Sequence, residues 1–79
     1  MNVLKTGASG PNVRDVQEML NLTVAEQPLL VADGIFGPKT SARVLKFQAD
    51  NKLVADGIVG PLTGQALVAA VITRTLKPR

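Results

Sequence analysis

The chain has 79 residues, of which 46% are apolar, and it contains no Cys, His, Trp or Tyr. This length allows one small domain, and the apolar content is typical of a folded chain and excludes a disordered one. Without Cys there are no disulfides, so helix packing has to stabilise the fold. Without Cys and His a zinc site is excluded, and we expect no metal and no other cofactor. No stretch approaches the roughly 20 apolar residues that cross a bilayer, so we expect no membrane partner.

The net charge is +3, but its distribution is uneven. Residues 1–70 contain six basic and six acidic residues, and the excess comes from Arg74, Lys77 and Arg79. A nucleic-acid-binding domain should carry basic residues on its folded face. Here the excess lies in an expected C-terminal tail, and we therefore expect no nucleic-acid partner.

The first helix is predicted over residues 11–22, with Ser9 or Gly10 as its cap and proline in its first turn. Apolar residues recur at helical spacing along it, namely Val13, Val16 and Leu20. Residues 23–32 are predicted to form a loop, because Pro28 would break a continued helix.

A ten-residue segment occurs twice, as VADGIFGPKT at 31–40 and as VADGIVGPLT at 54–63. In each copy Asp-Gly predicts a tight turn and Gly-Pro predicts the start of a helix. The second helix is predicted to end at Asn51-Lys52 and to have an apolar face of Val44, Leu45 and Phe47. The third is predicted to have an inner side of Leu62, Ala66, Leu67, Ala70 and Val71. Residues 72–79 are predicted to fray or to continue as a linker.

Three helices of about 10–13 residues predict an all-α fold, because each would be marginal alone and has to pack against the others. Two copies of a short segment are too few for a solenoid. The expected architecture is a compact three-helix bundle with two pseudo-repeated Asp-Gly corners, each leading from a turn into a helix.

Catalytic chemistry has little support in the sequence. Asp33 and Asp56 invite an acid–base pair, but equivalent environments give equivalent pKa values, whereas acid and base roles need different ones. The residues after Asp33 lack the oxygen ligands of a calcium loop. A nucleophilic Ser9 or Ser41 would have no histidine base. We therefore expect no catalytic residue.

Gln17 and Gln48 each interrupt an apolar stripe, and a half-buried amide has to find partners. The favoured interpretation is that they bind backbone groups of the repeated turns, and the alternative is that they face a ligand in a groove. Each Asp of the repeat is expected to bind backbone N–H groups of its own turn, or the hydroxyl of Thr40 or Thr63.

Lys39, Arg43 and Lys46 follow one another at i, i+4 and i+7 and therefore share a stripe of the second helix. Such a stripe is usually a solvated face, although it could attract an acidic polymer or a ligand carboxylate. Helix N-termini opened by Gly-Pro also offer N–H groups that bind carboxylates.

Taken in order, these motifs resemble the peptidoglycan-binding-domain-like (PGBD-like) family, also called peptidoglycan-binding domain 1. The matching residues are Gly10-x-x-Val13-x-x-Val16-Gln17-x-x-Leu20, Asp33-Gly34-Ile35-Phe36-Gly37-Pro38-x-Thr40, Val44-x-x-Phe47-Gln48 and Leu53-x-x-Asp56-Gly57-Ile58-Val59-Gly60-Pro61-x-Thr63-x-x-x-Leu67. The resemblance covers about residues 4–70. Family members are small three-helix modules attached to bacterial and phage cell-wall hydrolases, transpeptidases and related exported proteins. The present chain departs from the pattern in residues 26–30, which lack the usual glycine and aromatic residue.

The resemblance implies a monomeric module that binds peptidoglycan without catalysis and targets an attached or partner cell-wall hydrolase or effector to the wall. We expect stem-peptide carboxylates to meet the start of the second helix and its basic stripe, with glycines permitting close backbone approach. The expected ligand-binding residues are Asp33, Gly34, Phe36, Gly37, Lys39, Thr40, Arg43 and Gln48. The second corner, with Val59 and Leu62 in place of Phe36 and Lys39, is expected to be buried in packing. The alternative function is a structural or protein-interaction module that keeps the fold without binding the wall.

The expected domain covers residues 1–72, followed by a basic tail or linker over residues 73–79. Its expected site of action is the cell wall, the periplasm or the cell exterior. The polar N-terminus holds no apolar signal segment, so export would depend on lysis, injection machinery or another route.

Overall fold

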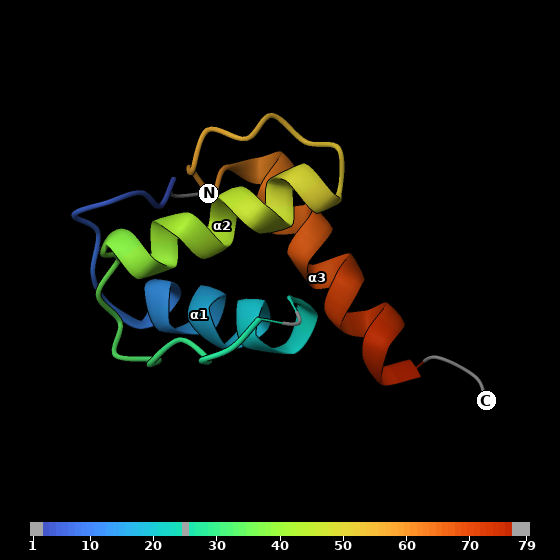
Figure 1. Cartoon of the computed structure of the whole chain (residues 1–79), viewed down its shortest axis with the longest axis horizontal. Helices are drawn as coiled ribbons and strands as arrows, with labels where there is room; N and C mark the ends of the chain where they lie inside the picture. The colour runs from blue at the N-terminus through green and yellow to red at the C-terminus, as the bar shows by residue number, and fades with distance from the viewer. Residues whose placement is uncertain (1–2, 25, 77–79) are drawn as a thin grey trace.

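The computed structural model describes residues 3–24 and 26–76 and has an all-α fold of three helices, as predicted. They are α1 (Pro11–Thr23), α2 (Pro38–Asp50) and α3 (Pro61–Leu76). The helix α1 packs against both α2 and α3, and α3 lies across the end of the α1–α2 pair (Figure 1). Each helix starts with proline directly after glycine. Proline suits this position because the first helical turn has no internal partner for its N–H groups.

The core consists of ten buried apolar residues from all three helices and the loops between them. They are Val13, Val16, Leu20, Val24, Leu30, Phe36, Val44, Phe47, Val59 and Leu67. Two predictions about this core are wrong, since Leu45 is 39% exposed and Leu62 is 73% exposed. Leu62 precedes the buried Leu67 by five residues, which places it about 140° around α3 and away from the core.

The N-terminal segment, residues 3–10, joins the two corners through backbone hydrogen bonds that the sequence did not predict. Leu4 and Val59 exchange two bonds, with N···O distances of 3.0 and 2.8 Å. Farther along, the Phe36 N–H donates to the Ala8 carbonyl at 2.9 Å. Phe36 and Val59 occupy equivalent positions of the repeat, and both side chains are buried. The segment therefore ties both corners to the core.

The helix α3 continues to Leu76. Residues 72–76 are therefore helical, and the prediction that they fray or form a linker is wrong, while residues 77–79 lie outside the described part of the chain. The boundary after residue 72 stays a prediction. No helix in the described residues combines the length and the apolar character needed to cross a membrane.

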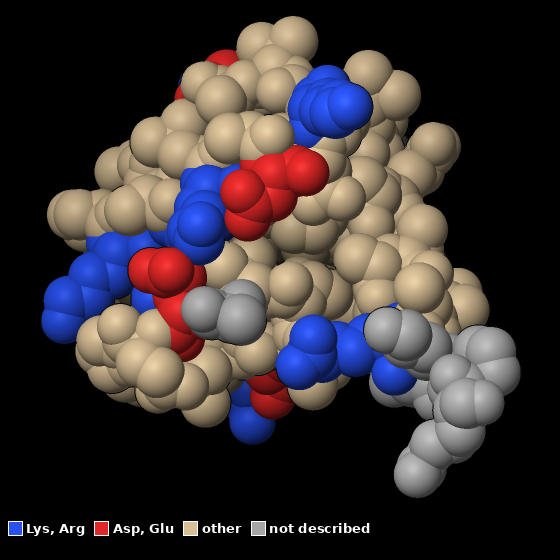
Figure 2. Space-filling view, turned by 45° about the vertical axis from the view of Figure 1, so that its right-hand side comes forward, with Lys and Arg blue, Asp and Glu red and all other residues tan. Residues whose placement is uncertain are grey.

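Charged side chains do not form one basic field on the face shown in Figure 2, where blue and red groups lie next to each other. Ion pairs join Arg14 to Glu18 at 3.9 Å and Lys46 to Asp50 at 3.6 Å. Much of this surface is uncharged.

Candidate ligand-binding site

The first corner, residues 33–40, is built around the buried amide of Gln17 from α1. The Gln17 Nε2 lies within hydrogen-bonding distance of Asp33 Oδ1 (3.1 Å), the Ile35 carbonyl (2.9 Å) and Thr40 Oγ1 (3.0 Å). The Gln17 Oε1 accepts a bond from the Gly34 N–H at 2.9 Å. One side chain thus holds the turn and the first turn of α2 together.

The second corner, residues 56–63, repeats this arrangement with Gln48 from α2. Its Nε2 lies within hydrogen-bonding distance of Asp56 Oδ1 (2.9 Å), the Ile58 carbonyl (3.0 Å) and Thr63 Oγ1 (3.1 Å), and its Oε1 accepts from the Gly57 N–H at 2.9 Å. The interpretation that both glutamines bind the repeated turns is confirmed. Gln48 is one of the expected ligand-binding residues, and the structure places its amide among the groups of the second corner.

The two aspartates bind the backbone of their own turns, as expected. Asp33 Oδ1 accepts a bond from the Ile35 N–H, and Asp56 Oδ1 accepts one from the Ile58 N–H, both at 2.9 Å. These backbone bonds, followed by the glutamine amide bonds, hold the pKa of each carboxyl below its ordinary value of 3.8. The suggested direct bond from Asp to Thr does not form, since the glutamine amide lies between them. Because the two environments are alike, the pKa is lowered in both carboxyls. Acid and base roles would need the two pKa values to differ.

Gly34 and Gly37 have different roles in the first corner. Gly34 has φ +78°, in the left-handed region, and a Cβ at this position would lie 3.2 Å from the Gly10 carbonyl oxygen. Glycine is therefore needed there by the fold. Gly37 has an extended φ of −108°, and open space lies where its Cβ would be. Only Gly37 leaves room for a ligand to approach the backbone.

A groove of about 680 Å³ runs beside the first corner, between the loop at residues 26–31 and the first two turns of α2. We call it the α2 groove. Its volume lies in the range of small-molecule binding sites. Five of the expected ligand-binding residues line it, namely Asp33, Gly37, Lys39, Thr40 and Arg43.

The other three expected ligand-binding residues lie elsewhere. Phe36 is 1% exposed, so its ring belongs to the core and offers no surface to a ligand. Gly34 is buried against Gly10, and Gln48 is buried in the second corner. Whether the five groove residues bind a ligand stays a prediction.

The three residues of the basic stripe of α2, Lys39, Arg43 and Lys46, differ in whether a nearby carboxylate compensates their charge. Lys46 lies 4.0 Å from a Glu26 carboxylate oxygen and 3.6 Å from one of Asp50, so its charge is compensated. Arg43 Nη2 donates to the Pro28 carbonyl at 2.9 Å, while its buried Nη1 has no hydrogen-bond partner among the described residues. Lys39 forms no ion pair within residues 3–24 and 26–76. The uncompensated positive charge therefore lies at the end of the groove nearest the start of α2.

Sequence reasoning missed the exposed large apolar side chains of the groove, which are Leu29, Val31 and Ile35. The only signal for two of them was the short apolar run at residues 29–31, which was interpreted as loop. In the structure only Leu30 of this run is buried, because Asn21 of α1 binds both its N–H and its carbonyl, at 2.8 and 2.9 Å.

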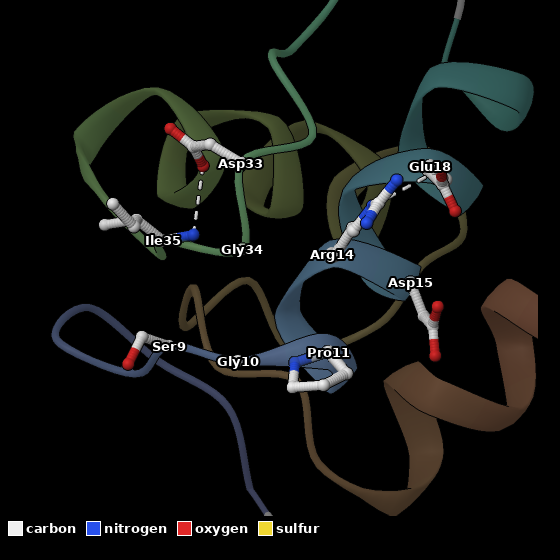
Figure 3. Close-up of a pocket in the computed structure, with 9 residues that line it drawn as sticks. All are labelled: Ser9, Gly10, Pro11, Arg14, Asp15, Glu18, Asp33, Gly34 and Ile35. Carbon is white, nitrogen blue, oxygen red and sulfur yellow. Dashed lines mark hydrogen bonds and ion pairs between the residues drawn. The ribbon is translucent and has the colours of Figure 1, made fainter.

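A second hollow lies at the start of α1, and Figure 3 shows the residues that line it, among them Ser9, Pro11 and Gly34. Three carboxylates line it, those of Asp15, Glu18 and Asp33, against the single guanidinium of Arg14. Arg14 is moreover paired with Glu18. This hollow is therefore less suited to an acidic ligand than the α2 groove. The described residues contain no group of three or more side chains that could hold a metal ion.

Solved structures similar to this chain contain the same kind of domain. A fused Zn-dependent amidase/peptidase/peptidoglycan-binding domain-containing protein from Clostridium acetobutylicum is 37% identical, with a TM-score of 0.74 over 84% of this chain and 28% of that one. The SleB N-terminal domain is 33% identical, with a TM-score of 0.75 over 89% of this chain and 93% of that one. A peptidoglycan-binding protein from Clostridioides difficile, solved in complex with glutamine hydroxamate, is 39% identical, with a TM-score of 0.76 over 84% of this chain and 40% of that one.

This chain thus spans less than half the length of the C. acetobutylicum and C. difficile chains. A search of curated proteins found no significant match. A family model described as "Putative peptidoglycan binding domain" matches residues 9–67, which include both glutamines, both corners and all three helix starts. The chain therefore belongs to this peptidoglycan-binding domain family.

Proposed function

We propose that this chain binds bacterial peptidoglycan without catalysis and holds an attached or partner cell-wall hydrolase or effector on the wall. The family and the fused amidase/peptidase of C. acetobutylicum support this assignment. The cell wall is accordingly the proposed site of action. The proposed binding site is the α2 groove.

The observation that carries the proposal is the uncompensated charge of Lys39 and Arg43 beside the start of α2. The stem peptides of peptidoglycan carry free carboxylates, which pair with guanidinium and ammonium groups and with the N–H groups of a helix start. Single sites of this kind bind weakly, at about −5 kcal/mol, which is a Kd of about 0.2 mM. Because the wall presents many equivalent sites close together, a chain that dissociates from one site can rebind to a neighbouring one, which increases retention.

A sedimentation assay with purified sacculi tests the proposal. We expect the wild-type chain to sediment with sacculi at low salt and the double variant Lys39→Leu/Arg43→Ala to bind about tenfold more weakly, because two charge-assisted contacts are lost. The variant Lys5→Leu/Arg14→Ala removes the same charge from exposed positions outside the groove and should sediment like the wild type. If the wild-type chain remains in the supernatant at low salt, the proposed function is wrong.

A second candidate function, a protein-interaction module, is favoured by the outer face of α3. Leu62, Val68 and Ile72 are all at least about half exposed, and residues 61–73 contain no charged side chain. Exposed apolar patches can mark protein contacts. Under this candidate the chain would not sediment with sacculi, and the substitution Val68→Lys would weaken capture of a fused or partner enzyme.

A further inference from the structure

Resting on the proposed function, we infer that the α2 groove binds the peptide part of peptidoglycan and not its sugar chain. The ligand class is a short acidic peptide with small aliphatic side chains. Its carboxylate lies at Arg43 and Lys39, and its aliphatic groups contact Leu29, Val31 and Ile35.

The first argument concerns the sugar, which finds no aromatic surface on this chain. Carbohydrate rings are commonly held by stacking on exposed aromatic side chains, which present a large apolar face with a polar edge. The sequence has no Trp or Tyr, and Phe36 and Phe47 are each only 1% exposed. A glycan would therefore have to depend on hydrogen bonds and aliphatic contacts, without aromatic stacking.

The second argument concerns the wall of the groove, which is aliphatic and rigidly placed. Both backbone groups of Leu30 are bound by the side chain of Asn21, and the Leu30 side chain is in the core. Its neighbours Leu29 and Val31 are therefore held facing outward, at 53% and 76% exposure. Ile35 is 60% exposed in the same groove. Such a wall suits methyl and methylene groups, because burying each CH₂ contributes about 0.8 kcal/mol.

The third argument concerns the unpaired guanidinium nitrogen. Arg43 is oriented by its bond to the Pro28 carbonyl, which leaves Nη1 buried and without a hydrogen-bond partner among the described residues. A buried polar nitrogen without a partner costs free energy, and a carboxylate oxygen would satisfy it. Lys39 is one helical turn away on the same face and can bind the second oxygen or a second carboxylate.

The fourth argument comes from the repeat, which serves as an internal control. Residues 23 positions beyond Lys39, Arg43 and Lys46 are Leu62, Ala66 and Ala69. The second corner therefore folds with the same hydrogen bonds and without any of these charges. The internal bonds of a corner therefore do not need these basic groups. Lys46 pairs with Glu26 and Asp50, whereas Lys39 and Arg43 have no carboxylate partner among the described residues, so the charges of these two point to a ligand.

An NMR titration of the ¹⁵N-labelled full chain tests the inference with four probes. They are the N-acetylated tetrapeptide N-acetyl-L-Ala-γ-D-Glu-L-Lys-D-Ala, whose net charge is −1, the same peptide with its carboxylates converted to amides, glycan strands stripped of peptides, and chitotetraose. We expect the acidic tetrapeptide to shift the amide signals of Val31, Lys39 and Arg43, and the amidated peptide to bind about tenfold more weakly. The two sugars should cause no shifts in the groove.

Two variants separate ligand contact from loop support. Arg43→Lys keeps the charge but loses the fork that binds both Pro28 and a carboxylate, so we expect peptide affinity to fall severalfold. Lys39→Ala removes a side chain that has no ion pair in the described structure. It should lower peptide affinity severalfold and leave the urea midpoint unchanged.

The outcomes distinguish the inference from the proposed function. Sedimentation with intact sacculi but not with peptide-stripped glycan supports both. Equal binding to stripped glycan, or tetrapeptide shifts confined to residues outside the groove, overturns the inference and leaves wall binding standing. Tetrapeptide binding in the groove without sedimentation on sacculi overturns the proposed function and leaves the peptide site.

Discussion

The two Asp-Gly corners have the same internal hydrogen bonds but different surroundings. Gln17 and Gln48 each contact an aspartate, a carbonyl and a threonine at distances that agree within about 0.2 Å. Around the first corner lie a basic stripe and an aliphatic groove, whereas the α3 positions equivalent to that stripe carry no charge. The repeated residues thus serve the fold, and the residues that are not repeated distinguish a candidate site from a structural corner.

This comparison also corrects an expectation about the second corner, which was predicted to be buried because Val59 and Leu62 are apolar. Val59 is indeed buried, but so is the equivalent Phe36. Leu62 is exposed like the equivalent Lys39. At these two positions burial therefore follows the place in the corner and not the residue type.

The largest expected effect comes from removing either glutamine. In Gln17→Ala or Gln48→Ala, the buried N–H of Gly34 or Gly57 and a buried threonine hydroxyl lose their partner and a cavity forms. We expect each change to lower the free energy of unfolding by about 3 kcal/mol. Urea denaturation followed by circular dichroism measures this loss. Since a domain of this size has only about 4–12 kcal/mol in total, both variants should be visibly less stable.

The exposed Gln65 of α3 provides the control for this comparison. Gln65→Ala should change the free energy of unfolding by less than about 0.5 kcal/mol. If the Gln17→Ala variant is as stable as this control, the amide network does not stabilise the first corner. A difference above about 1 kcal/mol between the two buried variants would show that the surroundings, and not the shared bonds, set the stability of a corner.

A smaller loss is expected from the glycines of the turns. Gly34→Ala forces a left-handed φ on alanine and places its Cβ 3.2 Å from the Gly10 carbonyl oxygen, so we expect a loss of about 2 kcal/mol. Gly57→Ala has the same φ problem, but its Cβ meets the Ser41 hydroxyl, which can rotate away, so its loss should be smaller. Thermal unfolding measures both.

Gly37 gives the matched control for the turn glycines. Gly37→Ser introduces a side chain into open space at the helix cap, where serine is favoured, and should leave the Tm unchanged or slightly higher. We expect the fold to require glycine at position 34 but not at position 37. If Gly37→Ser lowers the Tm as much as Gly34→Ala does, this distinction is wrong.

Acid should weaken both corners through their aspartates. The folded-state pKa of Asp33 and of Asp56 is lowered, so each carboxylate contributes stability above its unfolded pKa of about 4, and this contribution is lost as pH falls through the lowered folded pKa. We expect the Tm to fall as the pH drops below about 4. Asparagine keeps the accepting oxygen but does not titrate. Asp33→Asn should therefore reduce the loss of Tm in acid, and Asp33→Asn/Asp56→Asn should reduce it further. If the Tm of the double variant falls with pH as steeply as that of the wild type, the prediction is wrong.

The smallest effect is expected from replacing Lys46, which forms ion pairs with Glu26 and Asp50. The equivalent residue beside the second corner is Ala69, so these pairs have no counterpart there. The side chain is 44% exposed, and such pairs contribute about 0.5 kcal/mol or less. Lys46→Ala should lower the urea midpoint slightly at low salt and not at all in about 1 M salt, where the charges are screened. A loss that persists at high salt would mean that the Lys46 stem stabilises the loop by packing.

Much of the fold could be predicted because its signals are local. The three helix starts follow from Gly-Pro pairs, and the helical cores follow from apolar spacing at residues such as Val13, Val16 and Val44. Less of the site could be predicted. Five of eight expected residues line one groove, but Phe36 and Gln48 were misplaced because exposure and partner choice depend on contacts between segments distant in the chain.

By itself the sequence determined the all-α class and the two corners and favoured a structural role for both glutamines. Helix starts, turns and an amide inside an apolar stripe depend on short-range spacing and on the need to satisfy buried polar groups. Only the tertiary structure decided which corner each glutamine serves and that the N-terminal segment joins the two corners. It also decided that Leu29, Val31 and Ile35 form a groove with Arg43. Those features arise because α1, α2 and the loop at residues 26–31 pack against one another. Short-range sequence patterns do not predict that packing.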